Sequence, residues 1–525
     1  MNYIINPVLT GFNPDPSILR VGEDYYIATS TFEWFPGVQI HHSKDLIHWK
    51  LVAHPLNRIS QLNMKGNPSS GGVWAPCLSH CNGVFYLVYT DTKTLDGAFK
   101  DTHNYLVTAT DIHGEWSEPI YLNSSGFDPS LFHDRDGRKW LVNMLWDYRL
   151  GKNKFAGIVL QEYSMEEQKL IGKAKNIFKG SELGSTEGPH LYKHNGYYYL
   201  MVAEGGTWLN HAVTMARSKN IDGPYELDPA NPILTSRHDP LLVLQRAGHG
   251  SMVETQTGEW YLAHLCSRPI PTKGRSILGR ETALQKMKWT DDGWFRLEHG
   301  GNKPKVNVQA PDLPEHPWEA EPVRDDFNSE KLNINFASLR IPLDEDTMSL
   351  KERPGYLRLK GKESLGSRHK QSLVARRQQA FRYTATTCLE FEPEGFQQMA
   401  GLICMYDRQN FYYLRVSHDD ELGKCIGIVT AQNNVVNQPV QDVSINAWNS
   451  VYLRVMVDYD ELKFYYSKDE KNWTPLGPIM DASTLSDEFC LEGRFTGAFV
   501  GLCCQDMSGR DKNADFDWFE YRERE

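Results

Sequence analysis

The sequence lacks an uninterrupted apolar stretch of about 18 residues, so we expect no membrane-spanning helix and no membrane partner. It also lacks a long run of lysine and arginine, and its formal net charge is −11. Such a chain has no basic stripe to follow a phosphate backbone, which excludes nucleic acid as an expected partner. The first residues show no basic segment followed by an apolar core, so no signal peptide is expected.

Cysteines are few for the length, and their number, nine, is odd. Cys77 and Cys81 are four residues apart, but no second pair at zinc-ligand spacing accompanies them. Several of the others lie inside strand-like runs. This pattern predicts reduced, buried thiols in a cytoplasmic protein. The 525 residues, 40% hydrophobic and 23% charged, are enough for two or three soluble domains with sizeable cores.

What the sequence does contain is a repeat. Short apolar strands open at Asp15, Ala75, Asp128, Glu187 and His249, which are 53 to 62 residues apart. After each of these anchors, turn residues lead into an aromatic and β-branched run, as in a β-hairpin. A strand period of this length is typical of a propeller blade, so we predict a five-bladed β-propeller. Equivalent blade positions lie at one depth around one axis, and the three carboxylates should therefore converge on a central cavity.

The pattern changes after the fifth unit. Five prolines between residues 304 and 322 and the loss of hydrophobic periodicity indicate an extended connector. Beyond it, alternating strand-like segments follow one another for roughly 200 residues, which favours a β-sandwich. We therefore predict an all-β protein with a catalytic propeller over residues 1–303, a proline-rich linker over 304–324 and a β-sandwich over 325–525.

The three acids suggest acid/base chemistry. Asp15 lies between two prolines, which should hold its backbone extended and suit a positioned base. Asn-Pro-Asp-Pro is also turn chemistry, in which the aspartate only bonds nearby amides. The matching Asp128-Pro129 favours catalysis, because two unrelated turns need not share an acid at one blade position. Glu187 could be a solvated loop acid, but its equivalence to the other two again favours the cavity.

At these positions the chain resembles family 43 glycoside hydrolases, in particular the β-xylosidase branch with a C-terminal β-sandwich. The motifs that carry the resemblance lie at residues 11–17, 31–38, 71–76, 126–128, 186–190 and 278–283. The resemblance implies inversion at the anomeric carbon, with Asp15 as general base and Glu187 as general acid. It implies that Asp128 holds the acid in place and tunes its pKa. Cys77 stands where many members have aspartate, which puts substrate fit in question.

Other residues of these motifs are candidates for substrate binding. Arg280 could bond a sugar hydroxyl and offset the acids, or it could be a surface arginine paired with Glu281. Phe32 and Trp74 resemble subsite walls, and Phe495 resembles a sandwich residue that reaches the propeller mouth. Core packing is the alternative for all three. If Phe495 closes one end of the pocket, cleavage releases single sugars.

His249 holds the fifth blade's equivalent position. It could be a hydrogen-bonded core histidine, or it could stand beside a calcium ion, which the family often carries near the propeller axis. Calcium prefers oxygen ligands, so one imidazole alone would bind it weakly. No cofactor is expected to be required.

Three functions follow. The first is an exo-acting β-xylosidase that releases D-xylose from the non-reducing end of xylo-oligosaccharides, with α-L-arabinofuranosidase side activity. The second is a retaining fructan- or sucrose-cleaving enzyme of the related five-bladed kind. The third is a non-catalytic sugar-binding protein, against which three intact acids argue. A homo-oligomer is compatible with the sequence.

Overall fold

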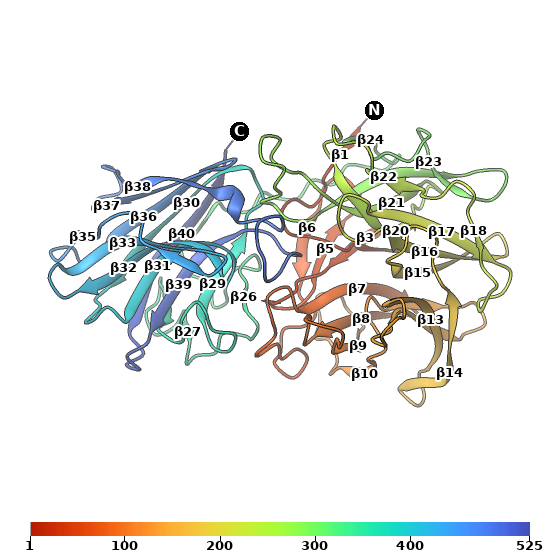
Figure 1. Ribbon diagram of the computed structural model, residues 1–525, viewed down its shortest axis with the longest axis horizontal. Helices are drawn as coiled ribbons and strands as arrows, with labels where there is room; N and C mark the ends of the chain where they lie inside the picture. Colours follow the sequence, from red (N-terminus) through yellow and green to blue (C-terminus); the bar gives the residue numbers. More distant parts are fainter. Residues whose placement is uncertain (1, 525) are drawn as a thin grey trace.

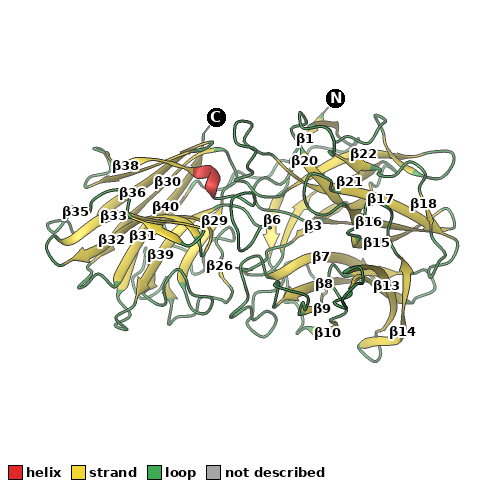
Figure 2. Ribbon diagram, in the orientation of Figure 1, coloured by secondary structure: helices red, strands yellow, loops and turns green. Residues whose placement is uncertain are grey.

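The computed structural model describes residues 2–524, and these form two parts that lie side by side (Figure 1). Strands make up nearly all of the regular structure, and the only helix in this range is the 3₁₀ turn η1 (Ala482–Thr484) (Figure 2). Across residues 2–524 we find no helix with the length and apolar character needed to cross a membrane. The prediction of an all-β fold is confirmed.

The first part consists of five antiparallel sheets in sequence order. Blade one contains β2 (Ser17–Val21), β3 (Asp24–Thr29), β5 (Gln39–Ser43) and β6 (Lys50–Ala53). Blade two contains β7 (Gly72–Cys81), β8 (Val84–Thr92), β9 (Thr102–Ala109) and β10 (Ile120–Asn123). Blade three contains β11 (Ser130–His133), β12 (Lys139–Trp146), β13 (Phe155–Ser164) and β14 (Lys169–Phe178).

The last two blades follow the same order. Blade four contains β15 (Glu187–His194), β16 (Tyr197–Glu204), β17 (Ala212–Ser218), β18 (Glu226–Leu227) and β19 (Leu234–Thr235), which pairs with β17. Blade five contains β20 (Gln245–Glu254), β21 (Trp260–Ser267), β22 (Glu281–Trp289) and β23 (Phe295–Leu297). The first strands of the five blades contact one another in a ring that closes between β20 and β2. The five-bladed propeller is therefore confirmed.

Both ends of the propeller chain meet at blade five. β1 (Tyr3–Ile5) pairs with β24 (Asn307–Gln309), and Leu9 bridges to Thr282 in β22. The N-terminal segment thus joins the first blade to the last, which closes the ring. β24 lies within the proline-rich stretch 304–324, so part of this stretch adds a strand to the propeller before the chain leaves it.

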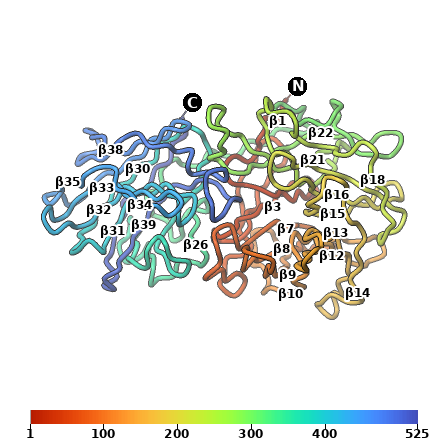
Figure 3. Tube along the Cα trace, viewed as in Figure 1, coloured from red at the N-terminus to blue at the C-terminus, as the bar shows by residue number. Residues whose placement is uncertain are grey.

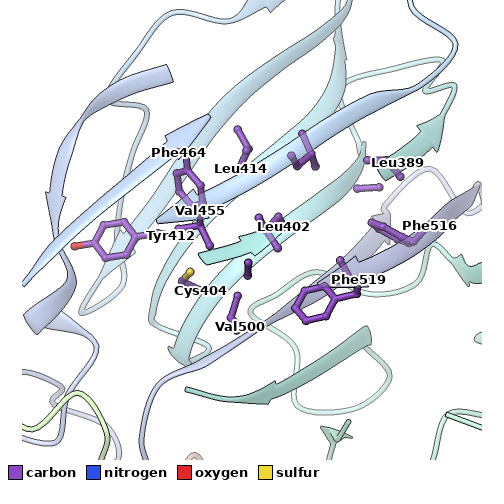
Figure 4. Close-up of a cluster of buried hydrophobic side chains, with 14 of the residues drawn as sticks. Leu389, Leu402, Cys404, Tyr412, Leu414, Val455, Phe464, Val500, Phe516 and Phe519 are labelled. Carbon is purple, nitrogen blue, oxygen red and sulfur yellow. The ribbon is translucent and has the colours of Figure 1, made fainter. Parts of the chain in front are cut away.

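The second part is a sandwich of two antiparallel sheets. One sheet contains β25 (Arg324–Asp325), β27 (Met348–Ser349), β28 (Leu357–Lys360), β30 (Arg382–Phe391), β36 (Val451–Asp458), β37 (Glu461–Ser467), β38 (Thr474–Asp481) and β40 (Asn513–Glu523). The other contains β29 (Ser372–Arg377), β31 (Gln398–Asp407), β32 (Asn410–Asp419), β33 (Gly423–Gln432), β34 (Val435–Asn437), β35 (Val443–Ser444) and β39 (Phe499–Asp506). Inward-facing side chains such as Leu402, Val455 and Phe516 fill the space between the sheets (Figure 4).

A hydrophobic interface joins the two parts. β4 (Trp34–Phe35) of the propeller pairs with β26 (Ser338–Leu339), which lies between β25 and β27 of the sandwich in the chain. Trp34 stacks on Phe499 with ring centroids 3.7 Å apart, and both rings are buried. In Figure 3, a loop from the C-terminal part of the chain (blue) lies beside the first segments of the propeller (red). The sandwich is thus fixed against blade one and also contacts the segment before Asp15, where Arg377 Nε donates to the carbonyl oxygen of Phe12 at 2.7 Å.

Candidate active site

One end of the propeller opens into a cavity of about 480 Å³. The structure brings all eight site residues predicted from the sequence into its wall: Asp15, Phe32, Trp74, Asp128, Glu187, His249, Arg280 and Phe495. The three acids come from the start of β2, β11 and β15, which are inner strands of blades one, three and four. The carboxylates converge because these strands occupy equivalent places around one axis.

Two of the acids have the same backbone conformation. Asp15 and Asp128 both have φ = +55°, in the left-handed region, and each stands two residues before its inner strand. The prediction of an extended backbone at Asp15 is therefore wrong. Aspartate is among the few non-glycine residues that tolerate this region. The same turn in two blades presents the two carboxylates to the cavity in equivalent ways.

Asp15 is set up as a charged carboxylate. Its Oδ1 accepts a hydrogen bond from Arg280 Nη1 at 3.0 Å, and its Oδ2 accepts one from Ser30 Oγ at 2.6 Å. Burial raises the pKa of Asp15, but the charge of Arg280 and the bond from Ser30 act against it, and the net pKa lies below the usual value. Asp15 can therefore act as a base.

Glu187 is set up in the opposite way. Burial and the like charge of Asp15 raise the pKa of Glu187 to about 8, although Arg280 lowers it. The pKa of Asp128 is also raised, by burial and by the charges of Glu187 and Asp15. Because repulsion between Glu187 and Asp128 is mutual, the two titrate as a pair that retains a proton near neutral pH. Glu187 can therefore donate a proton.

Asp128 also holds the backbone next to Glu187. Its Oδ2 accepts a hydrogen bond from the backbone N–H of Gly188 at 3.0 Å. Gly188 follows Glu187 directly in β15, so this bond ties the start of that strand to blade three. The arrangement gives Asp128 two ways to influence Glu187, one through charge and one through the backbone.

Arg280 lies at the centre of the site. Its side chain is buried, and Nη2 donates to the carbonyl oxygen of Phe495 at 3.0 Å in addition to the bond with Asp15. Glu281, the alternative partner considered from the sequence, instead binds Arg268, with Oε2 2.7 Å from Nε. Arg280 is therefore not a surface residue paired with Glu281, and it connects the base to the sandwich.

Three aromatic side chains form one wall of the cavity. Phe32 and Phe495 stack with ring centroids 6.1 Å apart, and Trp74 meets Phe495 edge-on at 6.2 Å. Phe495 belongs to the sandwich, and Gly493 allows its loop to approach closely, because a Cβ there would come within 2.4 Å of Ser70 Oγ. The sandwich thus contributes directly to the cavity wall.

His249 lines the same cavity, with Nδ1 3.7 Å from Asp15 Oδ1. Both oxygens of Asp15 already accept hydrogen bonds, and the Arg280 guanidinium lies beside them. Within residues 2–524, no group of three or more histidine, cysteine, aspartate or glutamate side chains is placed to hold a metal ion. The calcium ion expected beside His249 therefore stays a prediction, and we derive no step through it.

Several cavity residues were not predicted from the sequence. Phe127 meets Trp74 edge-on, with ring centroids 4.9 Å apart. Its place directly before Asp128 in the sequence could have indicated that it lines the cavity. Trp146 and Phe155 end β12 and begin β13, where the aromatic pattern alone does not indicate which side chains face the axis. Leu95 and Lys100, between β8 and β9, complete this side of the wall.

Cys77 does not line this cavity. Its buried Sγ lies 3.9 Å from His190 Nδ1, and both residues face a second hollow, at the opposite end of the inner strands. The departure from the family pattern at Cys77 therefore does not touch the carboxylate cavity. All nine cysteines of the chain are free thiols.

Comparisons with known proteins agree with this geometry. Residues 4–295 match the family described as "Glycosyl hydrolases family 43", and residues 324–522 match "Beta xylosidase C-terminal Concanavalin A-like domain". A "Beta-xylosidase" of Bacillus subtilis (strain 168) is 54% identical over 99% of this chain and 100% of its own. A "Xylosidase/arabinosidase 43B" of Humicola insolens is 52% identical, over 99% and 98% of the two chains.

A solved structure extends the comparison to three dimensions. The crystal structure of a xylan beta-1,4-xylosidase from Bacillus Halodurans C-125 superposes with a TM-score of 0.98, at 59% identity, covering 99% of this chain and 100% of that one. The alternative of a fructan- or sucrose-cleaving enzyme is not favoured by these matches. The propeller, the sandwich and the sequence all place the chain in one family, and it belongs to family 43 of the glycosyl hydrolases.

Proposed function

We propose that this protein is an inverting β-xylosidase that removes D-xylose from the non-reducing end of xylo-oligosaccharides. The observation that carries the proposal is the split between two buried carboxyl groups in one cavity. The pKa of Asp15 is lowered and that of Glu187 is raised to about 8, so near pH 7 one is a base and the other an acid. Acid/base pairs of this kind are set by environment.

The two groups can share the work of an inverting hydrolysis. Glu187 donates its proton to the glycosidic oxygen as the bond to the leaving sugar breaks. Asp15 accepts a proton from a water molecule that attacks the anomeric carbon from the opposite face. Arg280 holds the Asp15 carboxylate in place, and Asp128 holds the backbone beside Glu187.

The shape of the cavity supports cleavage at a chain end. Phe495 and its neighbours from the sandwich form part of the wall, and the rings of Phe32 and Trp74 pack against Phe495. A cavity closed on one side accepts a terminal sugar but not the middle of a chain. Release of single xylose units follows from this shape.

Anomer-resolved NMR of the first product tests the proposal. Hydrolysis of xylobiose should release α-xylose first at the cleaved sugar, because inversion converts the β-linkage to the α-anomer. The appearance of β-xylose first would indicate retention and would contradict the assignment of Asp15 as a base acting on water. A panel of nitrophenyl glycosides tests the α-L-arabinofuranosidase side activity that we include in the proposal.

The pH dependence of the rate gives a separate test of Asp128. Wild-type kcat/KM should fall as pH rises through about 8, since Glu187 must carry its proton. Asp128→Asn removes one charge of the coupled pair and keeps an acceptor for the Gly188 N–H, so the alkaline limb should move to lower pH. The acidic limb, governed by Asp15, should shift less. An alkaline limb that stays in place would mean that Asp128 acts through its hydrogen bond to Gly188.

Three wider expectations form part of the proposal. Residues 1–303 are assigned to catalysis, residues 304–324 to the connection and residues 325–525 to closure of the cavity. The reduced thiols support a cytoplasmic location. Light scattering on the purified protein will establish whether it forms a homo-oligomer.

A further inference from the structure

Two exposed aromatic side chains stand on loops whose neighbouring residues line the cavity. Phe99 and Tyr148, which we call the outer aromatic pair, are 69% and 54% exposed. Their ring centroids are 5.1 Å apart, and the planes are tilted by 40°. Large apolar side chains grouped on a surface indicate a binding function more often than isolated ones do. The pair takes no part in the acid/base chemistry described above.

The outer aromatic pair is continuous with the cavity wall. Leu95 and Lys100 line the cavity and flank Phe99 in the segment between β8 and β9. Trp146 also lines the cavity and stands two residues before Tyr148. Trp146 Nε1 donates to the carbonyl oxygen of Ala98 at 2.8 Å, which joins the two segments. A sugar chain leaving the cavity along blades two and three would therefore meet Phe99 and Tyr148.

Both segments are held in place by local contacts. The backbone N–H of Lys93 donates to the carbonyl oxygen of Asp101 at 2.8 Å, which closes the loop that carries Phe99. The backbone N–H of Asp147 donates to the carbonyl oxygen of Lys154 at 2.9 Å, which closes the loop that carries Tyr148. The pair is thus presented by two closed loops, and binding to it needs little ordering of the chain.

The ring of Trp146, which lines the cavity, already has charged partners. Lys100 Nζ lies 5.0 Å and Lys154 Nζ 5.8 Å from the centre of the Trp146 ring, so cations occupy positions over this ring. Among residues 2–524, no lysine or arginine lies over the ring of Phe99 or of Tyr148. A sugar ring offers an apolar face of C–H groups together with hydroxyls at its edge, which suits an aromatic platform with one phenolic O–H.

We propose that the outer aromatic pair binds the leaving-group end of xylo-oligosaccharides longer than the disaccharide. This inference rests on the proposed xylosidase function and extends it to a preference for longer chains. It predicts that the pair contributes to substrate binding only for longer substrates and that the bond-breaking step is unchanged.

Kinetics on substrates of different length test the inference. The double variant Phe99→Ala/Tyr148→Ala should lose about tenfold in kcat/KM on xylotetraose, mainly through KM, from the loss of two ring contacts. On xylobiose and nitrophenyl β-D-xylopyranoside it should stay within about twofold of wild type, because these substrates end inside the cavity. Phe396→Ala, which removes a 67% exposed ring from the sandwich, is the matched control and should change neither value.

The outcomes separate this inference from the proposed function. An unchanged kcat/KM on xylotetraose in an active double variant would overturn substrate binding by the outer aromatic pair and leave the proposed xylosidase function standing. Equal losses on all three substrates would overturn it too, since the pair would then act on the catalytic site. A change of oligomeric state in light scattering, without a length-dependent loss, would assign the pair to a contact between copies. If the wild-type protein is inactive on every xyloside, both the proposed function and substrate binding by the outer aromatic pair are overturned.

Discussion

Replacing Glu187 by glutamine should lower kcat/KM on xylobiose by about 10²- to 10⁴-fold, the range expected for loss of a general acid. The amide has nearly the same shape but no proton to give, and the leaving sugar cannot depart as an alkoxide at useful rates. A dinitrophenyl β-D-xylopyranoside needs no such proton, so its turnover should fall much less. Steady-state kinetics on both substrates measure the difference.

The contrast between the two substrates is the informative quantity. Equal losses on both would remove Glu187 from the role of acid and indicate that it positions the substrate. Glu182→Gln, a change at an exposed glutamate in the loop before β15, is the matched control and should leave both rates unchanged. The Glu187→Gln profile should also lose the alkaline limb near pH 8, because the titrating group is gone.

The spacing of the repeat was sufficient to predict how the acids come together. Anchors 53 to 62 residues apart implied equal depth on successive blades, and Asp15, Asp128 and Glu187 do line one cavity. This succeeded because the position of a side chain along an inner strand is a local property. It depends on where each strand begins, which turn residues and prolines indicate.

Contacts between distant segments could not be predicted in the same way. Arg280 bonds Asp15 across 265 residues, and Phe495 reaches the cavity only because the sandwich packs on blade one. Whether Arg280 pairs with its neighbour Glu281 or with the base depends on ring closure, which no local pattern contains. The left-handed turn at Asp15 was missed for a related reason. Flanking prolines favour extended backbone, and the packed structure overrides that preference.

Removing the base should affect every substrate alike. Asp15→Asn or Asp15→Gly should lower kcat/KM by about 10²- to 10⁴-fold on xylobiose and on dinitrophenyl β-D-xylopyranoside, because water must be activated whatever the leaving group. The loss should appear in kcat, since the carboxylate acts in the transition state and not mainly in binding. In Asp15→Asn the amide oxygen can still accept a hydrogen bond from Arg280 and the amide nitrogen can donate to Ser30 Oγ, so thermal unfolding should show that the variant remains folded.

A further acidic residue of the cavity wall, outside the three catalytic acids, serves as the control for Asp15. Asp96 lines the wall between β8 and β9, outside the group of three acids, and Asp96→Asn should leave both rates within about twofold of wild type. A folded Asp15→Gly variant with near-normal turnover would exclude Asp15 from the mechanism. A loss confined to xylobiose would instead make Asp15 a partner of the acid. Loss on both substrates, with inversion in the wild type, is the pattern expected of a base that activates water.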